Sequence, residues 1–297
     1  MGAWSCLLLS GIEGSKGFLH QLYAASGNFW QNLWDSVYKL FGRNDFAVGV
    51  IGSILFTNCV IWGANAIFLV LDTTGKPGFF MKYKVQMDKN VPVDRKKLKK
   101  AVKLVLFNGF VVAFPMTLLG IYTMKLRGCA FSGDLPTFTR VVVELIMFSL
   151  VEEFGFYYSH RLMYHPNVYK YIHKIHHEWT APIGIICIYA HPLEHCIVNM
   201  MPVILGPIIM GSHLATAWVW YFITLMSTTI SHCGYHFPFL PSQEAHDFHH
   251  QMFMNCFGVL GILDRLHGTD NIFRANKAYK RDKILLSLTP MSQQYPD

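Results

Sequence analysis

Three long stretches almost without charged residues constrain the fold of this chain more than any other feature. Residues 46–71 contain no Asp, Glu, Lys or Arg, residues 101–124 contain one, and residues 195–243 contain none. About 20 apolar residues in a helix suffice to cross the hydrocarbon core of a bilayer. Overall, 52% of the residues are apolar and 14% are charged, whereas about a quarter are charged in an average soluble domain. The sequence therefore predicts a membrane protein.

The third uncharged stretch is interrupted at Gly211, which favours two shorter helices, about residues 197–210 and 214–230, arranged as a hairpin. A mainly apolar run over residues 141–158 leads directly into His160. We expect an all-α, polytopic membrane protein with about four transmembrane helices, and a helical, histidine-rich domain for two metal ions that follows from the histidine pattern below.

A strongly basic loop separates the first two apolar stretches. Residues 72–103 contain ten Lys or Arg and three Asp, and such loops mark the cytosolic side of a membrane protein. The next stretch then leaves the cytosol near Lys125, and the run ending at Tyr158 returns, so the histidines that follow are expected to be cytosolic. Because the basic loop lies between two apolar stretches, we expect contact with anionic lipid headgroups and no nucleic-acid partner.

Histidine is concentrated in the second half of the chain. Thirteen of the fifteen histidines fall between residues 160 and 250, and ten form four groups. The groups are His160 with His165, His173-x-x-His176-His177, His232 with His236, and His246-x-x-His249-His250. Residues three and four apart share a helix face, so each His-x-x-His-His unit is expected to point three rings into one narrow arc.

Two such units suggest two metal ions. Neutral imidazole binds zinc, iron, copper and nickel, and ten residues could give each ion about five nitrogens while leaving a position open for catalysis. Carboxylates often orient such imidazoles, although solvation at the membrane interface is an equal alternative role for them. The candidates are Glu152, Glu153, Glu178 and Asp247. His191 and His195 could add nitrogens, or the element from His191 to Glu194 could shape a substrate pocket or cap a helix.

The four histidine groups, in this order among apolar stretches, resemble the fatty acid hydroxylase superfamily of membrane di-iron enzymes. This superfamily includes 4-methyl sterol oxidases, sterol desaturases, alkylglycerol monooxygenase and fatty acid 2-hydroxylases. Elements similar to the 4-methyl sterol oxidase branch are Ala181-Pro182, His191-Pro-Leu-Glu194 and Asp264-Arg-Leu-His-Gly268-Thr-Asp270. The resemblance implies that all ten grouped histidines bind iron. His236 stands where sterol oxidases tend to carry Asp, whereas fatty acid 2-hydroxylases place a histidine at this spacing.

The resemblance also implies an activity and its partners. It implies two iron ions, with zinc as an alternative occupant in purified protein, and dioxygen. Electrons would come from NAD(P)H through cytochrome b5 and its reductase. The expected reaction is oxidation of a lipid C–H bond at the endoplasmic reticulum membrane, with a cytosolic active site. A 4-methyl sterol is the favoured substrate, and a fatty acyl chain, a sphingolipid or an alkylglycerol are alternatives.

Two other classes of function compete with an oxygenase. A non-catalytic membrane scaffold could keep the histidines to bind zinc, and a metal transporter would spread them through the spans instead of grouping them at span ends. We expect four regions: an amphipathic or membrane-surface segment (1–45), a transmembrane hairpin with the basic loop (46–140), the catalytic domain (141–272) and a C-terminal tail (273–297).

Overall fold

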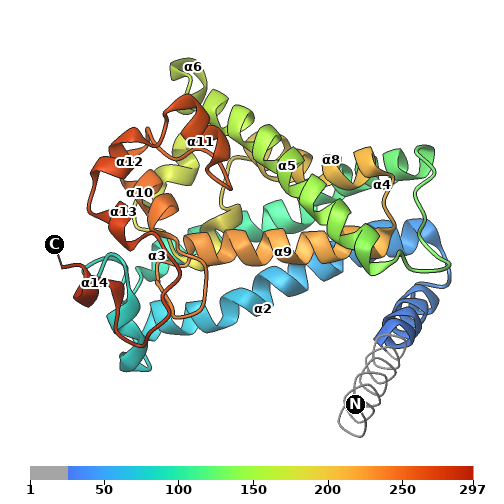
Figure 1. Cartoon of the computed structure of the whole chain (residues 1–297), viewed down its shortest axis with the longest axis horizontal. Helices are drawn as coiled ribbons and strands as arrows, with labels where there is room; N and C mark the ends of the chain where they lie inside the picture. The colour runs from blue at the N-terminus through green and yellow to red at the C-terminus, as the bar shows by residue number, and fades with distance from the viewer. Residues whose placement is uncertain (1–25, 297) are drawn as a thin grey trace, which may run out of the picture.

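The computed structural model describes residues 26–296, which are helical or irregular, with no β-strand among them. Figure 1 shows long helices running lengthwise through the molecule, with short C-terminal helices gathered at one end. The predicted all-α membrane architecture is confirmed. The expected surface segment lies partly outside the described residues. Residues 26–40 form a helix, and the Trp34 indole N–H donates to the Phe131 carbonyl at 3.1 Å.

Four helical segments are long and apolar enough to cross a membrane. They are Ala47–Thr74, with η1 (Ala47–Gly52) and α2 (Ser53–Thr74); Arg95–Leu126, with α3 (Arg95–Leu106), η3 (Phe107–Val112) and α4 (Ala113–Leu126); Pro192–Met210, with α7 (Pro192–Glu194), η6 (His195–Met200) and α8 (Met201–Met210); and α9 (Leu214–His232). Gly211 ends α8 with φ +63°, a conformation that glycine adopts without steric cost. The predicted hairpin between α8 and α9 is therefore confirmed.

A further long helix, α5 (Phe138–Met163), packs lengthwise against α8. Glycines allow this close approach: a Cβ atom at Gly206 would lie 3.0 Å from the Phe148 side chain, and one at Gly155 would lie 3.0 Å from Pro202. Small residues let helix backbones pack closely where water supplies no hydrophobic driving force. The contact fixes α5, which carries His160 near its end, within the same bundle as the four apolar segments.

The remaining helices are short and lie at one end of the molecule (Figure 1). They are η2 (Gly78–Tyr83), α6 (Pro166–Tyr169), η4 (His173–Glu178), η5 (Gly184–Ile188), α10 (Glu244–Met252), α11 (Ile262–His267), α12 (Asn271–Ala275), α13 (Ala278–Arg281) and α14 (Met291–Gln294). Two of them, η4 and α10, carry the two His-x-x-His-His units. Buried apolar residues of η5, with Trp179 and Tyr189 on either side, form a core against α2 and α3. This core supports the histidine-bearing segments from the bundle side.

One lysine of the basic loop is buried rather than exposed. Lys84 is 4% exposed, and its Nζ lies 3.2 Å from the Oδ1 of Asp72, which also accepts a 2.9 Å hydrogen bond from the Tyr235 hydroxyl. Backbone contacts support the pair, since the Val85 N–H donates to the Gly234 carbonyl. The basic loop is therefore tied to the connection that follows α9.

We predict that Asp72→Asn destabilises the protein by about 3 kcal/mol or more, because it leaves the Lys84 ammonium buried without its charged partner. The measurement is thermal unfolding in detergent. Asp72→Asn combined with Lys84→Met should recover much of the loss, and Asp88→Asn, which affects an exposed ion pair with Lys89, should change little. An unchanged unfolding temperature for the single Asp72 variant would contradict the role of the pair.

Candidate metal centre

Eight of the ten predicted histidines meet in two compact groups. We call His160, His173, His177 and His249 cluster 1, and His176, His232, His246 and His250 cluster 2. Within each cluster, one ring nitrogen from every residue lies within 4.8 Å of the others. The clusters are neighbours, because the ring centroids of His177 and His250 are 4.9 Å apart. Residues from the ends of α5 and α9, from η4 and from α10 therefore converge on one double site.

Each His-x-x-His-His unit is divided between the two clusters, which corrects the expectation of one arc per unit. In η4, His173 and His177 belong to cluster 1 and His176 to cluster 2. In α10, His246 and His250 belong to cluster 2 and His249 to cluster 1. Adjacent residues are about 100° apart around an α-helix and about 120° apart around a 3₁₀-helix. The consecutive histidines of a unit therefore point to different sites.

His165 and His236 are outside both clusters, contrary to the sequence prediction. α5 ends before Pro166, and the exposed His165 side chain turns back to cap α6, where its Nδ1 accepts from the Asn167 N–H at 3.3 Å. The His236 ring lies between the Glu244 carboxylate, at 3.4 Å, and the Lys283 carbonyl, at 3.0 Å. Turns of the chain after α5 and after α9 direct the rings of His165 and His236 away from the double site.

Outer hydrogen bonds fix the ring orientation of six clustered histidines. A carbonyl oxygen can only accept a hydrogen bond, so an Nδ1 beside it must carry the proton, and Nε2 keeps its lone pair for a metal. Five Nδ1 atoms lie 2.6–3.0 Å from carbonyls: His160 at Phe257, His176 at Tyr189, His232 at Thr228, His249 at Asn255 and His250 at Trp179. The His173 Nδ1 lies 2.7 Å from the Glu194 carboxylate. The Nε2 atoms are thereby directed inward.

Burial keeps the clustered rings neutral. It lowers the pKa of His173 to about 3 and, with the neighbouring imidazoles, the pKa of His249 to about 3. Burial and four nearby histidines also hold the pKa of His177 far below its usual value. Neutral imidazole is the form that binds metals. Near pH 7 the double site therefore offers uncharged nitrogen donors.

Glu153, Glu178 and Asp247 form their hydrogen bonds with groups other than the clustered imidazoles. Glu194 orients one of these imidazoles instead. Glu153 accepts hydrogen bonds from three backbone N–H groups of residues 259–263 at 2.7–2.9 Å, which holds the loop next to the Phe257 carbonyl. Glu178 pairs with Lys100, and Asp247 accepts from Gln86. From the sequence, Glu194 was expected only to shape a pocket or to act as an extra ligand. In the structure its carboxylate accepts a hydrogen bond from the His173 ring.

His191 and His195 also lie outside the clusters. The Nδ1 of His191 accepts from the Leu193 N–H at 3.2 Å and so caps α7, in line with one of the three roles considered from the sequence. His195 is buried and lines a cavity, with its Nδ1 3.4 Å from the Asn199 amide nitrogen. Neither ring reaches the double site.

Tyr164 is a site residue that the sequence analysis did not identify. Its hydroxyl contacts the Nε2 atoms of His177 and His249, the second at 2.9 Å. The phenol therefore lies against cluster 1, next to two candidate ligands. The only sequence signal is its position between His160 and His165, and a tyrosine at such a position is more often a packing residue.

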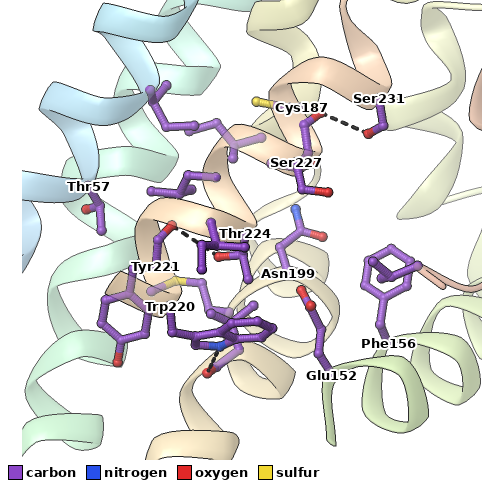
Figure 2. Close-up of a pocket in the computed structure, with 18 of the residues that line it drawn as sticks. Thr57, Glu152, Phe156, Cys187, Asn199, Trp220, Tyr221, Thr224, Ser227 and Ser231 are labelled. Atoms are coloured by element: carbon purple, nitrogen blue, oxygen red, sulfur yellow. Dashed lines mark hydrogen bonds between the residues drawn. The ribbon is translucent and has the colours of Figure 1, made fainter. Parts of the chain in front are cut away.

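A cavity of about 420 Å³ connects cluster 2 with the interior of the helix bundle. His232 and His246 line its inner end, and it extends along α9 as far as Trp220. Figure 2 shows side chains of α9, including Trp220 and Thr224, facing this space together with Glu152 and Phe156 of α5. At 1.5 Å per residue, the distance along α9 from His232 to Trp220 is about 18 Å. The cavity is therefore long, and its lining is mainly apolar.

The donor set fits transition-metal ions. Each cluster offers four neutral imidazoles and no carboxylate, a composition that suits iron, zinc, copper or nickel and not calcium or magnesium. Within cluster 1, the Nε2 of His173 lies 3.2 Å from that of His160 and 3.0 Å from that of His177. The Nε2 lone pairs of His160 and His173, which are directed at one point, repel one another, and a shared cation removes this repulsion.

Comparison with known proteins defines the class. The profile of the fatty acid hydroxylase family matches residues 145–269, which contain every clustered histidine. The chain is also 50% identical, over 279 residues, to fatty acid hydroxylase domain-containing protein 2 of Homo sapiens, covering 94% of this chain and 84% of that protein. The chain therefore belongs to the fatty acid hydroxylase family.

More distant relatives carry different activities in their names. Methylsterol monooxygenase 2-2 of Arabidopsis thaliana is 31% identical over 267 residues, covering 86% of this chain and 97% of that protein. Very-long-chain aldehyde decarbonylase GL1-8 of Oryza sativa subsp. japonica is 32% identical over 269 residues, covering 86% and 96%. No solved structure matches the chain.

We predict that His249→Ala lowers the metal content of the purified protein, because cluster 1 loses one of its four imidazoles. His165→Ala is the matched control and should leave the metal content unchanged, because its ring is exposed outside both clusters. The measurement is metal analysis per mole of folded protein. Equal metal loss in both variants would show that His165 is also a ligand.

The contact between Glu194 and His173 should strengthen metal binding. Glu194→Gln should weaken metal binding about ten-fold or more, because the carboxylate fixes the ring and increases its basicity. Asp88→Asn is the control, since its exposed carboxylate pairs with Lys89. Chelator titration reports the affinity, and equal affinities in the two variants would exclude the orienting role.

Proposed function

We propose that this protein is a membrane di-iron oxygenase that uses dioxygen to oxidise a C–H bond of a lipid, most simply of a sterol. The observation that carries the proposal is the continuity between the double histidine site and the long apolar cavity, which share His232 and His246. A lipid in this cavity would present one carbon to the site. A site that only stored metal would need no such cavity.

The eight clustered histidines are the proposed metal ligands, four to each ion. Iron at these positions would supply dioxygen activation and abstraction of hydrogen from an unactivated carbon. Neutral donors add no negative charge, and four ligands for each ion leave coordination positions open. The sequence pattern included His165 and His236, and we do not retain them as ligands because their rings lie elsewhere.

The chain's own residues have three tasks in this proposal. The outer hydrogen bonds from Nδ1 atoms hold the imidazoles in place, so little reorganisation is needed when a metal binds. Burial of the clusters among helices excludes water that would quench a strong oxidant. The cavity walls orient the lipid so that one carbon faces cluster 2, and proximity of this kind lowers the barrier to reaction.

The substrate class is proposed from the cavity and the relatives. A mainly apolar space of about 420 Å³ suits a lipid better than a polar metabolite. Two relatives in the family are named for a methylsterol and for a very-long-chain aldehyde, and another, from Mycosarcoma maydis, is named fatty acid hydroxylase ahd1. We favour a 4-methyl sterol, with a fatty acyl chain or a sphingolipid as the alternative.

We further propose an electron source and a location. Turnover needs two electrons from outside, and cytochrome b5 with its NAD(P)H reductase is the proposed donor at the cytosolic face. The basic loop over residues 72–103 supports a cytosolic position for the histidine end of the molecule. The proposed compartment is the endoplasmic reticulum membrane.

The test is turnover by purified protein in lipid vesicles with cytochrome b5, its reductase and NADPH. We expect iron in the protein and an oxygen-dependent product from a 4-methyl sterol. In His176→Ala the product should be lost and the iron content should fall. Product from a fatty acyl substrate alone would replace the sterol assignment. Bound zinc with no oxygen uptake on any lipid, even after reconstitution with iron, would favour a non-catalytic metal-binding scaffold instead.

A further inference from the structure

The cavity wall contains several polar groups, and most of them are already satisfied. The hydroxyls of Thr224 and Ser231 donate to carbonyls of their own helix, at 3.2 and 3.0 Å, and Ser149 does the same on α5 at 2.9 Å. Such hydroxyls leave little hydrogen-bonding demand inside the cavity. They do not by themselves require a polar group on the ligand.

Glu152 differs from these residues. Its side chain is partly buried and lines the cavity, and no hydrogen bond to its carboxylate is found within residues 26–296. The neighbouring Glu153, in contrast, accepts three backbone hydrogen bonds. A carboxylate that faces a mainly apolar cavity without a protein partner can accept a hydrogen bond from a molecule that enters this cavity.

A carboxamide, that of Asn199, lines the same cavity. Figure 2 shows Glu152 reaching from α5 toward Asn199 inside the cavity, and both residues line it. The Asn199 amide nitrogen lies 3.4 Å from the Nδ1 of His195, which leaves a second N–H of this amide for a ligand. The pair therefore offers an acceptor at Glu152 and a donor at Asn199.

We propose that Glu152 and Asn199 bind an uncharged hydroxyl group of the lipid substrate. A hydroxyl both donates and accepts, which matches this pair, whereas an ammonium group only donates. Burying an ammonium would also add a second desolvated charge inside a membrane protein. The inference rests on the proposed function of the same cavity and narrows its substrate class to lipid alcohols, which include sterols and fatty alcohols.

The test measures binding without turnover, using lipid pairs that differ only by the hydroxyl. The probes are cholesterol against cholest-5-ene, and 1-hexadecanol against hexadecane, each competing with a photoreactive sterol in purified, metal-loaded protein. We expect the native protein to prefer the alcohol of at least one pair by about ten-fold or more. The pair that shows the preference identifies the source of the hydroxyl.

Variants separate a hydroxyl site from general packing. Glu152→Leu should abolish the preference, and Glu152→Gln, which keeps an acceptor oxygen, should retain much of it. Phe156→Leu is the control on the same cavity wall, and it should alter the affinity for both members of a pair alike. Equal binding of both members of each pair to the native protein, or tighter binding of hexadecylamine than of 1-hexadecanol, would overturn the proposal.

Metal content and oxygen-dependent turnover are measured on the same preparations, so that the two proposals can fail separately. Loss of the hydroxyl preference in a protein that binds iron and oxidises a lipid would reject the role of Glu152 and leave the oxygenase intact. A clear preference in a protein that never consumes oxygen would reject the oxygenase and leave a lipid-alcohol binding site.

Discussion

The hydrogen bonds behind the imidazoles are the interactions on which the double site depends. Eight rings come from segments as far apart in sequence as His160 and His250, and their Nε2 atoms converge only because most Nδ1 atoms are held from behind. The acceptors are mainly backbone carbonyls, which have fixed positions once the local fold has formed. The site is therefore determined by the backbone path of short segments such as η5 and residues 255–257.

Those backbone paths are in turn fixed by buried polar side chains. The Asn108 amide donates to the carbonyls of Ile188 and Ala190 at 2.9 Å, on either side of the Tyr189 carbonyl that accepts from His176. Glu153 and Asp264 hold the loop that presents the Phe257 carbonyl to His160. Apolar helices thus provide the scaffold, and a few satisfied polar groups inside it set the metal geometry.

Much of this arrangement could be predicted from the sequence. The long uncharged stretches predicted the apolar helices, and eight of the ten grouped histidines meet as expected. The other two lie outside the clusters because local turns decide their direction: His165 follows the end of α5 and caps α6, and His236 follows a turn at Gly234. The division of each His-x-x-His-His unit between two clusters was also missed, because helical periodicity states which residues share a face but not which site each ring meets.

The orienting contacts were the least predictable part. Carboxylates near histidines in sequence, such as Glu178, were expected to hold the rings, yet Glu178 pairs with Lys100. The sequence does not show which backbone carbonyls accept these hydrogen bonds, because every residue has a carbonyl. Glu194 is 21 positions from His173, a separation that only the folded chain closes. Glu152 could be recognised as a candidate ligand-binding residue only when the cavity that it lines was defined.

The central claim, that two metal ions are each held by four imidazoles, is tested most directly by X-ray absorption spectroscopy on protein quantified for metal content. We predict two iron ions per chain, a first shell of nitrogen and oxygen donors dominated by histidine, and scattering from a second metal nearby. A single metal per chain, sulfur in the first shell, or no metal in folded protein would contradict the account.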